Sequence, residues 1–223
     1  MLQMIKGVIF DLDGTLIDSM YIWYQIDREL AAENGIPDLP REVSERIKKM
    51  SINEAAQFCI DELGFRMTKE QIIDRIEELV RIEYEEKIGL KPYVSGILDY
   101  LDEKGVPYGA ATATYKGLAE AVMKRCGIYD RMQFLLTDVE YPKGKKFPDI
   151  FLGAAERMGT SPAETLVVED SLHCLRTASA AGFSTVAVYD EAAEPEREEI
   201  EKTAGYYAGS LKDVKEYIAG NLI

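Results

Sequence analysis

The sequence predicts an α/β fold, in which a doubly wound parallel sheet carries an inserted helical domain. From residue 93 onward, short apolar runs of strand length alternate with helical segments, which is the pattern of doubly wound folds. An earlier apolar run, residues 5–10, is separated from the others by a long stretch with helical periodicity and no strand. The chain has 223 residues and 47% hydrophobic content, enough for a core and a smaller second domain.

The first predicted strand is followed directly by a block of predicted helices. Residues 5–10 are apolar or β-branched apart from Lys6 and Gly7, so this strand can be buried on both faces. Apolar residues then recur at three- and four-residue spacing. The spacing predicts four helices, over residues 19–33, over residues 41–50, after a capping box at Ser51–Glu54, and after a second capping box at Thr68–Gln71.

The remaining elements alternate to the end of the chain. Strands are expected at residues 106–111, 133–136, 165–168, 185–189 and 206–207, the last at a sheet edge. Helices are expected at residues 94–103, 118–126, 148–158, 172–181, 191–201 and 211–219. The Glu-rich segment 191–201 is expected to be a solvated helix. The expected domains are an α/β core of residues 1–17 and 89–223 and a helical domain of residues 18–88.

Composition excludes several classes of function. With 26 basic and 40 acidic residues the net charge is -14, which argues against nucleic acid or an anionic membrane as partner. An anionic substrate would need local positive charge. The longest stretch without a charged residue, 177–189, is shorter than the ~20 apolar residues of a membrane helix. The first residues lack the pattern of a signal peptide, so a cytoplasmic protein is expected.

The cysteines indicate neither a disulfide framework nor a zinc site. Cys59, Cys126 and Cys174 are far apart and lack C-x-x-C spacing, so we expect buried thiols. Cys174 follows the only histidine, His173. Neighbouring residues on a helix point about 100° apart, and this spacing disfavours a Cys/His nucleophile.

Two aspartates follow the first strand, at the edge of a parallel sheet where side chains converge on a crevice. Asp11 and Asp13 lie on the same side if the chain is extended. Gly14 allows a turn with amides facing an anion, and Thr15 adds a hydroxyl. Such close carboxylates are reasonable if Mg2+ bridges them or if their protonation states differ. An ionised carboxylate can also accept a phosphoryl group. The alternative is a loop whose aspartates cap turns.

The string D-L-D-G-T-L-I-D-S resembles the first motif of the haloacid dehalogenase-like (HAD) hydrolase superfamily. The resemblance implies a Rossmann-like core. It also implies that Asp11 is the nucleophile and Asp13 the general acid and base, and that the Asp11 carboxylate and Asp13 carbonyl hold Mg2+. The helical block resembles the cap of the phosphoglycolate phosphatase and β-phosphoglucomutase branch.

Two later strand ends resemble the second and third motifs of this superfamily. In A-A-T-A-T, the resemblance makes Thr112 and Ala113 substrate-binding residues, and Thr112 would hydrogen-bond a phosphate oxygen. A threonine at a strand end can also serve β-propensity or helix capping. In K-G-K-K-F-P-D-I-F, Lys145 would neutralise Asp11 and bind the transferring phosphoryl group. Lys146 occupies the usual proline position, so Lys143 and Lys146 stay open as candidates beside a solvated basic loop.

The strand V-V-E-D-S resembles the fourth motif. The resemblance makes Asp170 a magnesium ligand and Glu169 a further acidic residue that acts directly or through water. Oxygen ligands of this kind suit octahedral Mg2+. The family usually has a glycine-rich run next, whereas this chain has Leu172, His173 and Cys174. His173 could reach the site or be a structural or surface residue.

Taken together, the four motifs predict a Mg2+-dependent phosphatase of a small phosphorylated metabolite, a monomer or weak homodimer. Asp11 would attack phosphorus and Asp13 would protonate the leaving alcohol and then activate water. The nearest alternative is a phosphomutase, for which Arg46, Lys48 and Lys49 resemble basic cap residues of β-phosphoglucomutases. A catalytically silent binding module on the same fold is the third possibility.

Overall fold

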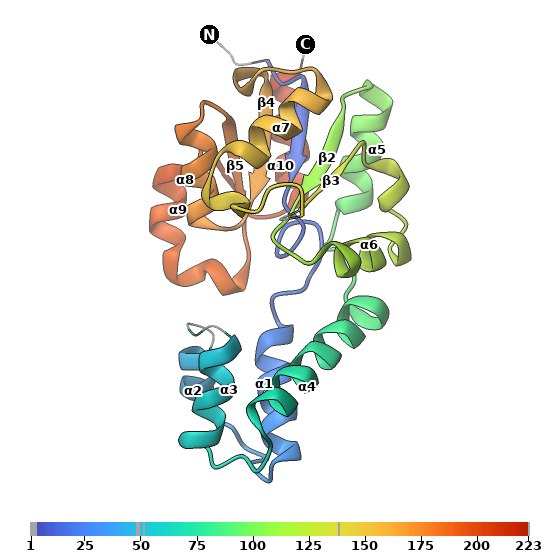
Figure 1. Cartoon of the computed structure of the whole chain (residues 1–223). Helices are drawn as coiled ribbons and strands as arrows, with labels where there is room; N and C mark the ends of the chain where they lie inside the picture. Colours follow the sequence, from blue (N-terminus) through green and yellow to red (C-terminus); the bar gives the residue numbers. More distant parts are fainter. Residues whose placement is uncertain (1–3, 48–49, 51, 138, 223) are drawn as a thin grey trace. The chain divides into compact units, whose positions relative to one another are not determined.

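A computed structural model describes residues 4–47, 50, 52–137 and 139–222. The chain divides into two compact units, Met1–Ser19 with Ile88–Ile223 and Met20–Lys87 (Figure 1). The larger unit contains the sheet, and the smaller one contains only helices among its described residues.

The sheet of the larger unit is parallel and confirms the predicted fold class. Its strands are β1 (Gly7–Phe10), β2 (Tyr108–Ala111), β3 (Leu135–Leu136), β4 (Thr165–Glu169), β5 (Ser184–Val188) and β6 (Tyr206–Ala208). Their order is β3-β2-β1-β4-β5-β6. In register, Phe10 pairs with Ala110 on one side and Val168 on the other. The strand order reverses between β1 and β4, where open α/β sheets form their ligand crevice.

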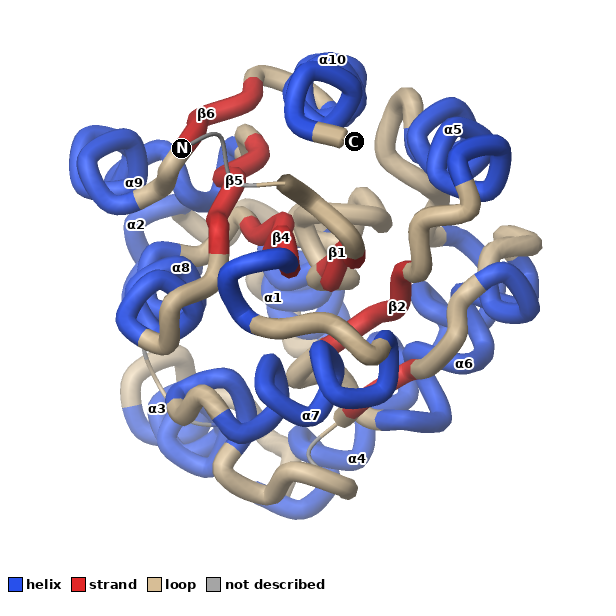
Figure 2. Tube along the Cα trace, turned by 90° about the horizontal axis from the view of Figure 1, so that it is seen from above, coloured by secondary structure: helices blue, strands red, loops and turns tan. Residues whose placement is uncertain are grey.

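Helices cover both faces of this sheet (Figure 2). They are α5 (Val94–Lys104), α6 (Lys116–Arg125), α7 (Asp149–Met158), α8 (Leu172–Ala180), α9 (Arg197–Thr203) and α10 (Leu211–Asn221). Figure 2 shows α5 and α10 on one face and α7 and α8 on the other. Short 3-10 turns occur at η2 (Tyr129–Arg131), η3 (Gly144–Lys146) and η4 (Pro162–Glu164). The core between sheet and helices includes Ile9, Val167, Phe151 and Phe183.

One predicted helix was wrong in extent. The Glu-rich segment forms a 3-10 helix, η5 (Glu191–Glu196), and α9 starts only at Arg197. Pro195 lies in this segment, and proline lacks the N–H donor that a continuous α-helix needs. The helix is also not wholly solvated, because Ile200 is buried.

The smaller unit contains α1 (Ile22–Glu33), α2 (Arg41–Ile47), α3 (Ile52–Asp61), α4 (Lys69–Ile82) and a π-helical turn, η1 (Glu83–Lys87). The predicted capping box at Thr68 is confirmed, since the Gln71 N–H donates to the Thr68 hydroxyl and the Thr68 N–H donates to the Gln71 side chain. The other predicted box involves Ser51, which lies outside the described residues. Apolar residues at helical spacing are buried, among them Ile72, Ile76 and Leu79 of α4.

None of the three described cysteines forms a disulfide. Cys59 and Cys174 are buried as expected, whereas Cys126 is only half-buried. Among the residues that the structure describes, none of the helices has the length and apolar character needed to cross a membrane.

Candidate active site

The loop after β1 turns sharply at the carboxyl edge of the sheet. The Asp11 N–H donates to the Val168 carbonyl at 2.9 Å, which ties this residue to β4. Gly14 has a φ of 76°, a conformation that glycine adopts without steric cost. The N–H groups of Leu16 and Ile17 both donate to the Leu12 carbonyl at 2.9 Å, so the turn closes on itself.

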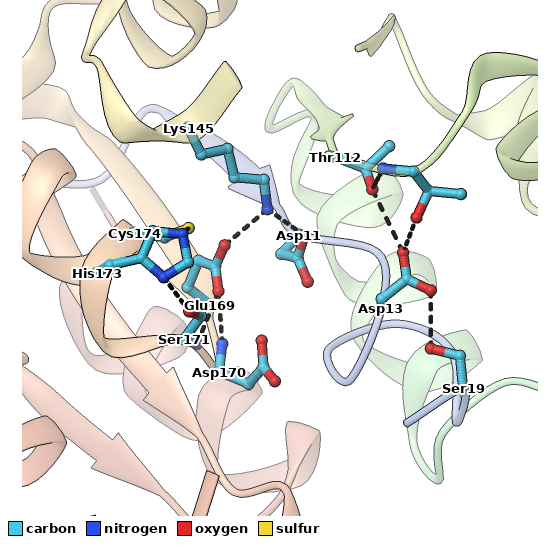
Figure 3. Close-up of polar contacts among 11 residues, drawn as sticks. Asp11, Asp13, Ser19, Thr112, Lys145, Glu169, Asp170, Ser171, His173 and Cys174 are labelled. Carbon is cyan, nitrogen blue, oxygen red and sulfur yellow. Dashed lines mark hydrogen bonds and ion pairs between the residues drawn. The ribbon is translucent and has the colours of Figure 1, made fainter. Parts of the chain in front are cut away.

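Lys145 joins the ends of β1 and β4 (Figure 3). Its ammonium bonds to the Asp11 carboxylate and to Glu169 Oε1, the latter at 2.6 Å. The lysine is only 6% exposed, as is Asp11. Lys143 instead lies 5.1 Å from the centre of the Phe147 ring, and Lys146 is exposed. Of the three candidate lysines, Lys145 is therefore the one that reaches the acidic cluster.

Three acidic side chains meet around this lysine. Carboxylate oxygens of Asp11, Glu169 and Asp170 lie within 4.8 Å of one another, and all three residues are buried. Glu169 Oε2 also accepts the N–H groups of Asp170 and Ser171 at 2.9 Å.

The charges in this cluster are unequal. Burial, reinforced by the Glu169 charge, raises the pKa of Asp11 to about 8 although Lys145 opposes the shift. Burial and the charges of Glu169 and Asp11 also raise the pKa of Asp170 well above its usual value. Burial would raise the pKa of Glu169 too, but the Lys145 charge and the hydrogen bonds to Glu169 hold it below the usual value.

This donor set fits a divalent cation. Carboxylate oxygens are ligands preferred by Mg2+, and three carboxylates face a single ammonium. The raised pKa values of Asp11 and Asp170 reflect burial and like-charge repulsion that a cation would relieve. The buried cluster could therefore hold a metal ion.

Asp13 lies in a separate polar environment (Figure 3). Its Oδ1 accepts from the Ser19 hydroxyl at 2.8 Å. Its Oδ2 accepts from the hydroxyls of Thr112, at 3.4 Å, and Thr114. Its carboxylate is not one of the three clustered around Lys145. Asp11 and Asp13 therefore lie in the same loop but have different partners in the folded chain.

The remaining predicted residues lie around these groups. The Thr112 hydroxyl accepts the Thr114 N–H at 3.0 Å and is buried, while Ala113 is exposed. The Thr15 hydroxyl is buried and has no hydrogen-bond partner within the described part of the chain. The reasoning from sequence gave Ser19 no role, although it stands in the D-S pair that ends the first motif.

His173 and Cys174 do meet, so the argument from helix geometry was wrong. His173 Nε2 is 3.2 Å from Cys174 Sγ, and its Nδ1 is 2.7 Å from Ser171 Oγ. His173 lies in the first turn of α8, where its ring lies close to Ser171 and Cys174 (Figure 3). Burial and then the Glu169 charge raise the pKa of the Cys174 thiol, and a neutral thiol is a poor nucleophile.

The smaller unit has its own candidate residues. Trp23 is 42% exposed on α1. A groove of about 470 Å3 on this unit is lined partly by Tyr24 and Arg28, whose guanidinium lies 5.6 Å from the Tyr24 ring centre. The Arg46 guanidinium lies 4.8 Å from the centre of the Phe58 ring. Lys48 and Lys49, the other basic candidates, lie outside the described residues.

The chain is similar to known proteins in sequence. The family model for haloacid dehalogenase-like hydrolases matches residues 8–188. Hexitol phosphatase A of Escherichia coli is 29% identical over 197 residues, which cover 88% of each chain. β-Phosphoglucomutase of Bacillus subtilis is 28% identical over 191 residues, covering 82% of this chain and 83% of that protein.

A solved structure also matches the whole chain. A HAD family hydrolase from Deinococcus radiodurans, crystallised with phosphate and sodium, superposes with a TM-score of 0.79 at 19% identity. The match covers 98% of this chain and 97% of the other, and at this identity it shows the fold alone. From the family model, which matches residues 8–188, we conclude that the chain belongs to the haloacid dehalogenase-like hydrolase family.

Proposed function

We propose that the chain is a phosphatase that hydrolyses a phosphate monoester of a small metabolite with the help of Mg2+. The observation that carries this proposal is the buried ion pair of Asp11 and Lys145 beside further carboxylates at the sheet edge. A carboxylate there can act as nucleophile, while the ammonium offsets charge on the phosphoryl group. The phosphatases among the relatives support the same reaction class.

In this mechanism Asp11 and Asp13 have different tasks. An Asp11 carboxylate oxygen attacks phosphorus, and the bond from phosphorus to the ester oxygen breaks. The leaving oxygen takes a proton from Asp13, which must be protonated at that step. Asp13 then removes a proton from water, whose oxygen attacks the aspartyl phosphate and releases phosphate and the free Asp11 carboxylate.

Several groups would position the phosphate. We assign this role to Lys145, to Thr112 and Ala113 after β2, and to Gly14 and Thr15 in the turn after Asp13. As a donor, the Thr112 hydroxyl makes a long bond to Asp13, 3.4 Å, so its proton can turn to a phosphate oxygen at little cost. The Thr15 hydroxyl would contribute only if the ligand reaches its buried position.

Asp11, Glu169 and Asp170 would hold the metal ion, together with the Asp13 carbonyl. When bound there, Mg2+ would supply positive charge that stabilises the phosphoryl group during transfer. Glu169 already accepts three hydrogen bonds, so its contribution could be made through water.

The two parts of the chain would divide the work. We propose residues 1–17 and 89–223 as the catalytic core and residues 18–88 as a cap that selects the substrate, with exposed Trp23 as one candidate contact. A cytoplasmic location, the absence of nucleic-acid partners and a monomeric or weakly dimeric state are part of the same proposal.

A phosphomutase is the second candidate, because one relative is a β-phosphoglucomutase. It would need a second phosphate anchor in the cap. Of the three basic candidates, Arg46 packs over the Phe58 ring, and Lys48 and Lys49 lie outside the described residues.

The test is hydrolysis of p-nitrophenyl phosphate with Mg2+ or EDTA, followed by a panel of sugar and hexitol phosphates. We expect Asp11→Asn to lower phosphate release by more than about a thousandfold. The exposed Asp99→Asn serves as matched control and should keep wild-type activity. Normal turnover by Asp11→Asn would rule out the covalent mechanism.

Two other outcomes favour the alternatives. Conversion of a sugar phosphate to its isomer when primed by a bisphosphate, with little free phosphate, would indicate a mutase and can be followed by 31P NMR. No Mg2+-dependent hydrolysis of any substrate would favour a catalytically silent module.

A further inference from the structure

Lys91 makes a set of contacts that the proposed mechanism does not use. Its ammonium donates to the Gly14 carbonyl at 2.6 Å, to the Tyr189 carbonyl at 2.9 Å and to Asp190 Oδ2 at 2.9 Å. An ammonium has three N–H donors, so each one has an acceptor. The Lys91 side chain is 15% exposed and that of Asp190 7%. One lysine therefore joins the turn after β1 to the loop after β5.

The bond to Gly14 controls a peptide close to Asp13. The Gly14 carbonyl and the Thr15 N–H belong to the same peptide group. That N–H donates to the Leu12 carbonyl at 3.4 Å, a weak bond, whereas the bond from Lys91 is 2.6 Å. Gly14 has a φ of 76°, and glycine rotates more freely than other residues when released. Lys91 thus makes the shorter of the two hydrogen bonds to this peptide group.

An ordinary structural ion pair does not account for these contacts. The Lys91 N–H already donates to the Leu16 carbonyl at 2.9 Å, so the backbone alone attaches this segment to the turn. Asp190 is held separately, because its Oδ1 accepts the Ala192 N–H at 2.9 Å. At the turn after β1, the Lys91 side chain adds a bond that orients the Gly14 carbonyl.

We propose that Lys91 is a positioning residue, which fixes the peptide after Gly14 and so holds Asp13 where it can transfer protons. The proposal rests on the proposed function, in which Asp13 is the general acid and base. Removing the ammonium should leave Lys145, Thr112 and Ala113 in place but let the turn that contains Asp13 and Gly14 move. Small displacements of reacting groups lower rate more than they weaken binding.

The test compares Lys91→Met, which keeps the apolar stem, with Asp190→Asn, which removes the ion-pair charge but leaves the bond to Gly14. For Lys91→Met we expect a fall in kcat of about tenfold or more with KM within about threefold. Hydrogen–deuterium exchange of a peptide covering residues 11–18 should become about tenfold faster. Asp190→Asn should show neither change.

The exchange measurement needs no activity, so it separates this proposal from the proposed function. If the wild type hydrolyses no phosphate ester, the phosphatase fails, and exchange in residues 11–18 still decides whether Lys91 holds the turn. Unchanged exchange in Lys91→Met overturns the proposal, as do equal losses of kcat in both variants. If Lys91→Met does not fold, Lys91→Gln, whose amide is one bond too short for Gly14, should show the same faster exchange and lower kcat, and wild-type values in it overturn the proposal.

Discussion

Lys145 is the residue on which the electrostatics of the site depend. Burial alone would lower the pKa of its ammonium, but the neighbouring Asp11 and Glu169 carboxylates raise it above the usual value. The side chain therefore stays charged at neutral pH. Removing one partner of a buried ion pair leaves the other partner uncompensated, so we expect this lysine to contribute to folding as well as to the proposed catalysis.

We expect Lys145→Met to lower phosphate release by more than about a hundredfold, because a charge directed at the phosphoryl group is lost. The metal-free variant should also unfold at lower urea concentration than the wild type, since Asp11 and Glu169 lose their shared cation. Lys146→Met is the matched control on the same turn and should behave like the wild type. If instead Lys146→Met were the inactive variant, the assignment of the lysine would be wrong.

The sequence could predict some residues of the candidate site but not the contacts between them. Asp11, Asp13, Lys145, Glu169 and Asp170 were proposed as site residues because they stand in short motifs that follow predicted strands, and Lys143 and Lys146 stayed open beside Lys145. The hydrogen bonds of Asp13 were not predicted, because the donors come from two different loops and only folding brings them together. The same holds for Lys91, which stands in no motif.

At the scale of elements, strand β2 packs closely against the Phe134 side chain. All of its residues are buried, and the Phe134 ring packs on the strand at Gly109. A Cβ added at Gly109 would lie 2.5 Å from that ring, closer than van der Waals contact allows. The glycine thus allows a bulky aromatic side chain to fill the space beside the strand.

Gly109→Ala should lower the free energy of unfolding by about 1 to 3 kcal/mol, the usual range for an overpacked core. Gly117→Ala on α6 is the control. It meets nothing within 4 Å, and a helical alanine should raise stability by up to about 1 kcal/mol. Urea unfolding of the purified variants measures both, and equal stability of the two would contradict the packing argument.

The elements differ in how far the sequence could predict them. The helices that end at Gly105 and Gly159 were predicted closely, because a glycine in the left-handed conformation is a local stop signal. The π-helical turn after α4 was missed. Its buried Glu83 accepts from Tyr21, Gln25 and Lys87, and two of these lie far away in the sequence. The break at Pro195 was visible in the sequence but was given too little weight.

For the molecule as a whole, the excess of acidic residues makes stability depend on pH. The net charge of -14 decreases in magnitude as carboxylates are protonated. A carboxylate that accepts hydrogen bonds in the folded state also accepts them less strongly once it is protonated. Glu164 is such a group, since it joins the chain before β1 to the turn before β4. Hydrogen bonds from Lys6 and then Ser161 lower its pKa from 4.5 to about 2.

Because the pKa of Glu164 is lower in the folded state, its contribution to stability is complete above about pH 4.5 and is lost as the pH falls toward 2. We therefore expect Glu164→Gln to shift the urea midpoint downward at pH 7 and to shift it by about half as much at pH 3, where part of the contribution is already lost. The difference between the two midpoints, measured across this pH range, is the readout. A shift of the same size at both values would mean that the charge of Glu164 does not contribute.

The short backbone pairing between the segments at Ile17 and Leu90 has a consequence for how such proteins diversify. Ile17 pairs with Leu90, and the Asp18 N–H donates to the Gly89 carbonyl at 3.0 Å. The chain thus leaves the larger unit and re-enters it through neighbouring backbone segments. An intervening stretch whose ends meet can be lengthened, shortened or exchanged without rerouting the strands. If the cap selects the substrate as we propose, recombination at these two points would give new specificity while Asp11 and Lys145 stay in place.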